Sequence, residues 1–189
     1  MIVNPTAEGL AAAAAGAAGR RGPPPVHLWN PPFCGDIDMR IARDGTWFYQ
    51  GTPIGREPLV RLFASILRFE DGRHYLVTPV EKVGITVEDA PFVAVDFRVA
   101  DPGPDQVATF VTNLGDEAAA GPDNPLYATG DAAAGRITPY IHIRRGLVAR
   151  IDRKSFYRLI DFGLEQDGWF GLRSAGRFFP LAPASALSA

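Results

Sequence analysis

The sequence predicts an α+β fold in which a mostly antiparallel sheet is built from two related halves. Each half contains a strand–strand–helix–strand unit. Residues 54–63 line up with residues 151–160, with Ile, Arg, Arg and Leu in common, and in both stretches apolar residues recur at helical spacing. Turn signals with strand patterns on either side precede the two stretches, at residues 44–45 and 145–146. An Asp-Gly turn and a further strand pattern follow each of them.

Composition places the chain among ordinary globular proteins. It has 189 residues, of which 47% are hydrophobic and 21% charged, and this length suits one domain or two small halves that share a core. A net charge of −2 gives no electrostatic reason to expect nucleic acid. The single cysteine fits a reducing compartment, and no apolar run is long enough to span a bilayer. We therefore expect a cytoplasmic protein with neither nucleic-acid nor membrane partners.

Three segments are predicted along the chain: an Ala- and Pro-rich segment (1–25), a first half (26–90), and a second half (91–183) that includes an inserted β-meander. Because alanine is the best helix former, residues 6–19 predict a short surface helix. The Pro-rich residues 20–25 then break the helix and form a stiff linker. Such a run can also bind a protein partner, although a spacer is the favoured interpretation.

The first half reads as a hairpin, a helix and a strand. Residues 37–41 alternate between apolar and polar side chains as a half-buried strand does, and residues 46–49 form the return strand. A helix is expected from residue 56 to residue 70, with Gly55 at its N-cap. Residues 73–78 form the strand after it.

The second half begins with the inserted meander and then repeats the order of the first half. Residues 93–99 and 107–112 have strand patterns, whereas residues 117–136 predict a long loop with one short strand near residues 126–127. The repeated elements are strands at 140–144 and 147–151, a helix over residues 153–166 with Asp152 at its N-cap, and strands at 169–172 and 176–181.

The sequence contains several motifs that are not general features of α+β proteins. They are WNPPFCGDIDM at 29–39, DGTWF at 44–48, PIGR at 53–56, LVTPVE at 76–81, VEDAPF at 87–92, PYI at 139–141, Arg144, and FFPL at 178–181. With these motifs, residues 26–182 resemble the bacterial domain-of-unknown-function family numbered 1285. The resemblance implies an α+β fold of two related halves and a regulatory role in signal transduction, suggested by gene neighbourhood. It supplies no catalytic or binding residues.

The two predicted helix starts form the strongest candidate site. Arg56 and Arg153 fall at the first helical position, where a cation opposes the helix dipole by about 0.3–1 kcal/mol. Free N–H groups at a helix start, together with an arginine fork, can bind a carboxylate or phosphate. We therefore predict a small acidic ligand in a groove between the two halves. The alternative, which is commoner in proteins, is that each arginine pairs with a local carboxylate such as Asp36, Asp38, Asp44 or Glu81.

Further candidates come from the motifs and from single residues. Trp29, Asn30, Glu81 and Arg144 join Arg56 and Arg153 as candidate ligand-binding residues. The three histidines lack metal-ligand spacing, and no Gly-rich phosphate loop is present, so we predict no metal and no cofactor. Cys34 could act as a nucleophile only beside an imidazole, and we favour a structural cysteine. The choices for that imidazole are His27, His74 and His142.

The predicted function is a non-enzymatic regulatory or ligand-sensing module with no catalytic residue. Two alternatives stay open. One is a protein-interaction adaptor that uses a sheet edge or the Pro-rich segment, and the other is a hydrolase that uses Cys34 or a Glu/His pair. The identity of the ligand and the oligomeric state do not follow from the sequence.

Overall fold

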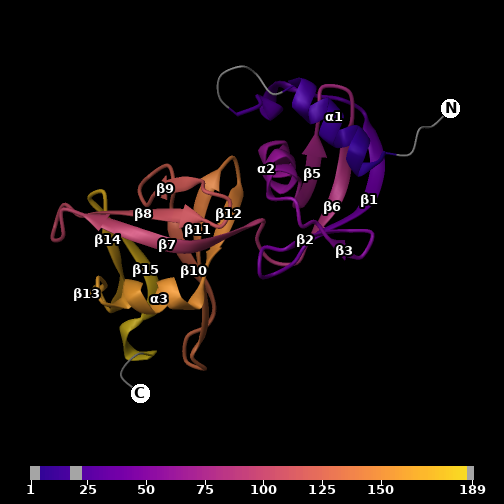
Figure 1. Ribbon diagram of the computed structural model, residues 1–189. Coiled ribbons are helices and arrows are strands. Elements are labelled where there is room, and N and C mark those ends of the chain that lie inside the picture. Colours follow the sequence, from indigo (N-terminus) through magenta and orange to yellow (C-terminus); the bar gives the residue numbers. More distant parts are fainter. Residues whose placement is uncertain (1–4, 18–22, 187–189) are drawn as a thin grey trace. The chain divides into compact units, whose positions relative to one another are not determined.

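The chain forms two compact units, Met1–Asp89 and Ala90–Ala189, which we name the N-terminal unit and the C-terminal unit. The computed structural model describes residues 5–17 and 23–186, which are drawn as coloured ribbon in Figure 1. Within the described residues, no helix has the length and apolar character needed to cross a bilayer.

The N-terminal unit contains a six-stranded sheet in the order β3-β2-β1-β6-β5-β4. Two antiparallel meanders build this sheet, and they meet where β1, the first strand, pairs in parallel with β6, the last. The bounds are β1 Phe33–Ile41, β2 Trp47–Tyr49, β3 Thr52–Pro53, β4 Leu67–Glu70, β5 Arg73–Val77 and β6 Lys82–Val87. No strand was predicted for the β6 segment.

The described residues of this unit form two α-helices, α1 (Ala7–Ala17) and α2 (Glu57–Ser65), and these contact each other (Figure 1). α1 confirms the predicted N-terminal helix, and it buries Leu10 and Ala14 at helical spacing. Residues 18–19 of that prediction and residues 20–22 of the predicted linker lie outside the described residues. α2 packs on the sheet through Phe63, whose ring stacks with that of Trp47 at a centroid distance of 6.3 Å.

The C-terminal unit contains a second six-stranded sheet, in the order β10-β11-β12-β7-β8-β9. Here too the first strand, β7, pairs in parallel with the last, β12. The bounds are β7 Phe92–Ala100, β8 Val107–Thr112, β9 Glu117–Ala119, β10 Leu126–Asp131, β11 Arg136–Arg144 and β12 Leu147–Ile151. Phe92, Phe110, Ile141 and Ile151 are among its fully buried side chains.

A helix and a small sheet complete the C-terminal unit. α3 (Arg153–Ile160) follows β12 and contacts β7. β13 (Leu164–Gln166), β14 (Trp169–Ser174) and β15 (Arg177–Pro183) form an antiparallel three-stranded sheet. Ser174 joins this sheet to the larger one, because its hydroxyl accepts the N–H of Ala108 at 3.0 Å and donates to the carbonyl of Ala120 at 2.7 Å.

The predicted fold class is confirmed: the protein is α+β, mostly antiparallel, with two similar six-stranded halves. The order hairpin, helix, strand also occurs twice along the chain. Strand pairing, however, matches β1–β6 with β7–β12, so that α2 connects two meanders whereas α3 follows the last strand of its sheet. The local likeness between residues 54–63 and 151–160 is therefore not part of the repeat of the sheets.

Both helices are shorter than predicted, and this is a correction. They end at Ser65 and Ile160 rather than at residues 70 and 166. The apolar side chain of Leu67 continues the helical spacing but belongs to β4. Left-handed residues after each segment, Asp71 (φ 51°) and Asp167 (φ 52°), begin tight turns that pair β4 with β5 and β13 with β14.

The two helix starts also differ from each other. Arg56, not Gly55, is the N-cap of α2, and its side chain makes no capping hydrogen bond. Pro58 falls in the first turn, where its missing N–H is tolerated. Asp152 is the N-cap of α3 as predicted, and its carboxylate accepts the N–H of Ser155 at 2.7 Å.

Residues 117–136 do not form one long loop. They contain β9 and the six-residue strand β10, which pairs with β11 from Leu126 to Asp131. Gly130 has a φ of 106°, and a Cβ atom there would lie 2.1 Å from the carbonyl oxygen of Arg136. The glycine is thus needed for close strand approach, although in the sequence it resembles a loop signal.

Candidate functional site

A pocket of about 450 Å³ lies beside α3 in the C-terminal unit. Its walls come from the start of β11, the end of β12, one face of α3, and β14 and β15. Volumes of roughly 300–1,000 Å³ are typical of small-molecule sites. The larger apolar side chains of its lining are Ile137, Pro139, Ile151, Phe156, Ile160 and Phe170.

The polar part of the lining is positively charged. Arg150 and Arg153 line the pocket together with Thr138 and Tyr157, and no Asp or Glu is among the described lining residues. Arg150 lies half-buried at the end of β12 and has interactions within the protein. Since guanidinium groups pair with carboxylate and phosphate in a planar fork, the lining suits a molecule that is acidic at one end and apolar elsewhere.

The start of α3 gives Arg153 a defined position. Asp152 caps the helix, so Arg153 is its first residue. One turn later, the hydroxyl oxygen of Tyr157 accepts hydrogen bonds from Arg153 Nε at 3.1 Å and Nη2 at 2.9 Å. The guanidinium carbon also lies 5.5 Å from the centroid of the Tyr157 ring. Arg153 has no carboxylate partner in the described part of the chain, so the predicted local ion pair does not form there.

The other end of α3 is tied to the larger sheet. Arg158 Nη1 contacts Asp96 Oδ1 at 2.5 Å, and its Nη2 donates to the carbonyl of Phe97 at 3.2 Å. The hydrogen bond from Arg158 lowers the pKa of the Asp96 carboxyl. These contacts fix the helix on β7, and so they hold the wall of the pocket that carries Arg153.

Arg56 has a different environment in the N-terminal unit. It is exposed, and its side chain makes no hydrogen bond or ion pair with any residue that the structure describes. Two of the carboxylates considered as its partners are engaged elsewhere. Asp36 pairs with Arg73 at 2.8 Å, and Asp44 Oδ1 accepts the N–H of Thr46 at 2.9 Å.

The other candidates of the N-terminal unit do not converge on Arg56. The carbonyl of Trp29 accepts a hydrogen bond from Arg68 at 2.9 Å, and the N–H of Glu81 donates to Thr78 Oγ1 at 3.2 Å. In residues 5–17 and 23–89, no hydrogen bond or ion pair joins any two of Trp29, Asn30, Arg56 and Glu81. The groove between the halves stays a prediction.

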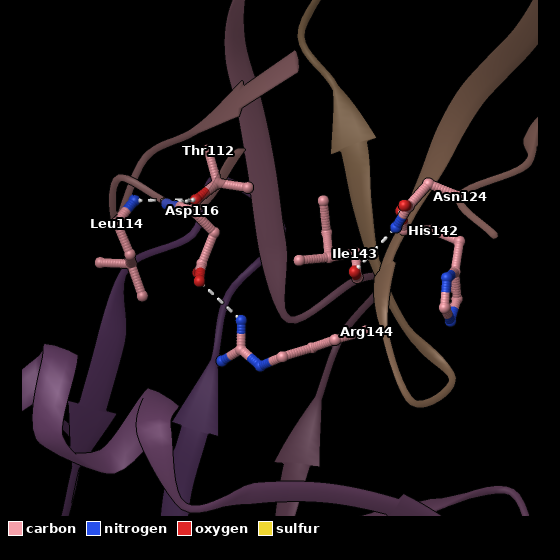
Figure 2. A network of polar contacts seen from close by, with 7 residues as sticks. All are labelled: Thr112, Leu114, Asp116, Asn124, His142, Ile143 and Arg144. Atoms are coloured by element: carbon pink, nitrogen blue, oxygen red, sulfur yellow. Dashed lines mark hydrogen bonds and ion pairs between the residues drawn. The ribbon is translucent and has the colours of Figure 1, made fainter. Parts of the chain in front are cut away.

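Arg144 belongs to a polar network away from the pocket. Figure 2 shows its guanidinium pointing toward Asp116, and Nη1 lies 2.7 Å from Asp116 Oδ1. Thr112 Oγ1 accepts the N–H groups of Leu114 and Asp116, which fixes the turn after β8. The guanidinium also lies 5.0 Å from the ring centroid of Phe92. Arg144 therefore ties β11 to this turn, and it does not line the pocket.

Cys34 and the histidines form no catalytic arrangement among the described residues. Cys34 is exposed, and its thiol contacts the carbonyl of Pro32 at 3.5 Å rather than an imidazole. His142 Nε2 accepts the N–H of Gly146 at 2.9 Å, and its Nδ1 lies 3.0 Å from the carbonyl oxygen of Asp123. Burial lowers the pKa of His74 to about 4. No group of three or more His, Cys, Asp or Glu in the described chain is placed to hold a metal ion.

Sequence reasoning placed Arg153 at its helix start but missed the rest of the pocket. The sequence spacing of Arg150 and Tyr157 could have indicated that they lie near Arg153. Arg150 lies just across the strand-to-helix junction, and Tyr157 lies four residues beyond Arg153, which is one helical turn. The walls contributed by Ile137 and Phe170 come from strands distant in sequence. No local pattern indicates that they face the same space.

Comparisons with known proteins give one consistent family. The model of the DUF1285 N-terminal domain matches residues 24–90, and that of the DUF1285 C-terminal domain matches residues 91–181, both described as of unknown function. No curated protein matches the chain.

Two solved structures are similar to the whole chain or to much of it. A DUF1285 family protein from Silicibacter pomeroyi DSS-3 is 63% identical, with a TM-score of 0.89 over 96% of this chain and 98% of that one. A DUF1285 family protein from Shewanella baltica OS155 is 31% identical, with a TM-score of 0.54 over 67% of this chain and 92% of that one. The chain therefore belongs to the DUF1285 family.

Proposed function

We propose that the protein is a non-enzymatic ligand-sensing module with a regulatory role in signal transduction, and that its C-terminal unit binds a small acidic ligand in the pocket beside α3. The observation that carries this proposal is a cavity of about 450 Å³ lined by two arginines and no carboxylate among the described residues. The proposal keeps the predicted class of ligand and the predicted residue Arg153. It moves the site from a groove between the halves into one unit.

The chemistry of the lining supports binding rather than catalysis. In its described part the lining has no carboxylate, imidazole or thiol, and these are the groups that most often act as general bases or nucleophiles. Its polar side chains are two guanidinium groups, one hydroxyl and one phenol. Such groups hold and orient an anion.

Thermal unfolding of the full chain tests the proposed function. The probes are acetate, hexanoate, phenylacetate, citrate and inorganic phosphate, each added at constant ionic strength to the wild-type protein, Arg153→Ala and Lys154→Ala. A ligand that binds only the folded state raises the melting temperature. We expect at least one probe to raise it for the wild type and for Lys154→Ala, with at least tenfold weaker binding to Arg153→Ala.

Lys154→Ala is the matched control. It removes one positive charge from the neighbouring position of α3, and Lys154 does not line the pocket. If no probe stabilises the wild type, or if both variants respond like the wild type, the proposed site is wrong.

A further inference from the structure

We infer that the ligand is a monocarboxylate with an apolar body, and not a polyanion such as phosphate. This inference rests on the proposed function, and it names the class of ligand for the same pocket. It depends on how the charged and apolar parts of the lining are distributed.

The charged part has one arginine committed to the protein and one that is open to a ligand. Arg150 has interactions within the protein, and its Nε is buried. Arg153 gives two of its five N–H donors to the neutral hydroxyl of Tyr157. The described residues offer the remaining donors no further partner. One open fork matches one carboxylate in a planar, two-point contact.

The apolar part of the lining is larger than the polar part. Ile137, Pro139 and Ile151 come from the larger sheet, and Phe156, Ile160 and Phe170 come from α3 and β14. A dianion that lost water against these side chains would leave several acceptor positions unsatisfied, which is unfavourable. A single carboxylate leaves few positions unsatisfied, and its apolar body fills the remaining space.

The rim of the pocket carries exposed apolar surface that such a body would cover. Tyr157 is 55% exposed and Ile160 is 36% exposed, although both line the cavity. Each methylene group removed from water contributes about fourfold in affinity. Affinity is therefore expected to rise with the apolar body until the cavity is filled.

Titration calorimetry on the full chain tests this inference with a matched series. The ligands are acetate, butyrate, hexanoate and phenylacetate, the uncharged hexanamide and phenylacetamide, and inorganic phosphate. We expect affinity to rise about fourfold per methylene from acetate to hexanoate. The amides should bind at least tenfold more weakly than the matching acids, and phosphate should bind more weakly than hexanoate.

Tyr157→Phe separates a positioning role from a structural one. This variant keeps the ring and removes the oxygen that orients Arg153. We expect it to weaken carboxylate binding several-fold without changing amide binding. A change of equal size for acids and amides would show that the hydroxyl only supports the fold of the wall.

The outcomes distinguish the inference from the proposed function. If acetate or phosphate binds as tightly as hexanoate and Arg153→Ala abolishes that binding, the site binds anions without an apolar preference, and only the inference is overturned. If the acids bind no better than their amides, the assignment of the carboxylate to Arg153 is overturned. If nothing in the series binds, the inference and the proposed function both fail.

Discussion

Tyr157 shows how one neutral oxygen sets the chemistry of the pocket. Its hydroxyl holds two donors of Arg153 without neutralising the guanidinium charge. A carboxylate at the same place would have paired with that charge and made it less available to a ligand. At the residue scale, the guanidinium of Arg153 is thus held in one orientation while its charge stays available to an anionic ligand.

His74 determines a pH dependence of stability. Burial lowers the pKa of His74 to about 4 from its ordinary value of 6.5, and its ring packs on Phe69 at a centroid distance of 4.8 Å. The unfolded chain binds a proton more readily than the folded chain. The stabilising contribution is therefore complete above pH 6.5 and is lost as the pH falls through about 4.

We expect His74→Gln to flatten this dependence. Between pH 6.5 and pH 4 the wild type should lose about 1–2 kcal/mol more stability than the variant, a value reduced because the imidazole is only partly buried. Urea unfolding at several pH values measures the difference. Parallel losses in the two proteins would contradict the assignment to His74.

Some site residues follow from sequence and others do not. Asp152 is a good N-cap residue, and the sequence alone therefore places Arg153 at the first position of α3. Gly55, which precedes Arg56, has no side chain that could accept an N–H, and Arg56 itself is the N-cap of α2. The partners of Arg144 and the walls of the pocket depend on pairing between distant strands, which side-chain type does not indicate.

At the scale of elements, Gly171 allows the close pairing of β14 with β15, which we call the β14–β15 seam. A Cβ atom at this position would lie 2.1 Å from the carbonyl oxygen of Phe179 and 2.8 Å from the ring of Phe178. The neighbouring residue Phe170 and the paired strand residue Ala182 both line the pocket. Close approach of the two backbones therefore shapes one wall of the site.

Gly171→Ala is expected to destabilise the protein by about 1–3 kcal/mol, because the backbone must shift to admit the methyl group. Urea unfolding measures this loss. Gly121→Ala is the matched control in the same unit, since its Cβ would meet Ala175 at an ordinary 3.5 Å. Equal stability of the two variants would show that the β14–β15 seam tolerates separation.

Elements in which apolar residues keep one regular spacing were predicted well. Elements that end where this spacing changes from that of a helix to that of a strand were not. Alternation at 93–99 indicated β7, and the Ala-rich segment indicated α1. Leu67 continues the helical spacing of apolar residues in α2, and it is also an apolar residue suited to a buried position in a strand. Only the pairing with β5 decided between these two structures.

At the scale of the whole molecule, each unit has its own buried core. Trp47 and Phe63 are buried in the N-terminal unit, and Phe92 and Phe110 in the C-terminal unit. Every residue of the pocket lies in the C-terminal unit. The sequence predicted two related halves, but strand pairing was needed to show that the repeat consists of six strands in the same order.

Residues 90–189 produced alone are therefore expected to fold and to bind the same acids as the full chain, with affinity within about threefold. Circular dichroism during heating and titration calorimetry measure folding and binding. Residues 1–89 produced alone serve as the control, and we expect no binding to them. Loss of cooperative unfolding in residues 90–189 would show that this core depends on the rest of the chain.

The parallel pair at the centre of each sheet has a consequence for synthesis on the ribosome. Asp36 on β1 pairs with Gly84 on β6, so the earliest strand of the unit gains one of its two neighbours only after the latest strand has emerged. Until then, a nascent β1 exposes an open edge on that side, and unpaired edges promote association between chains. The same adjacency places the first and last strands of each six-stranded sheet side by side. A circular permutant with new ends in a hairpin turn should therefore keep the sheet. It should change which strand stays without a neighbour during synthesis.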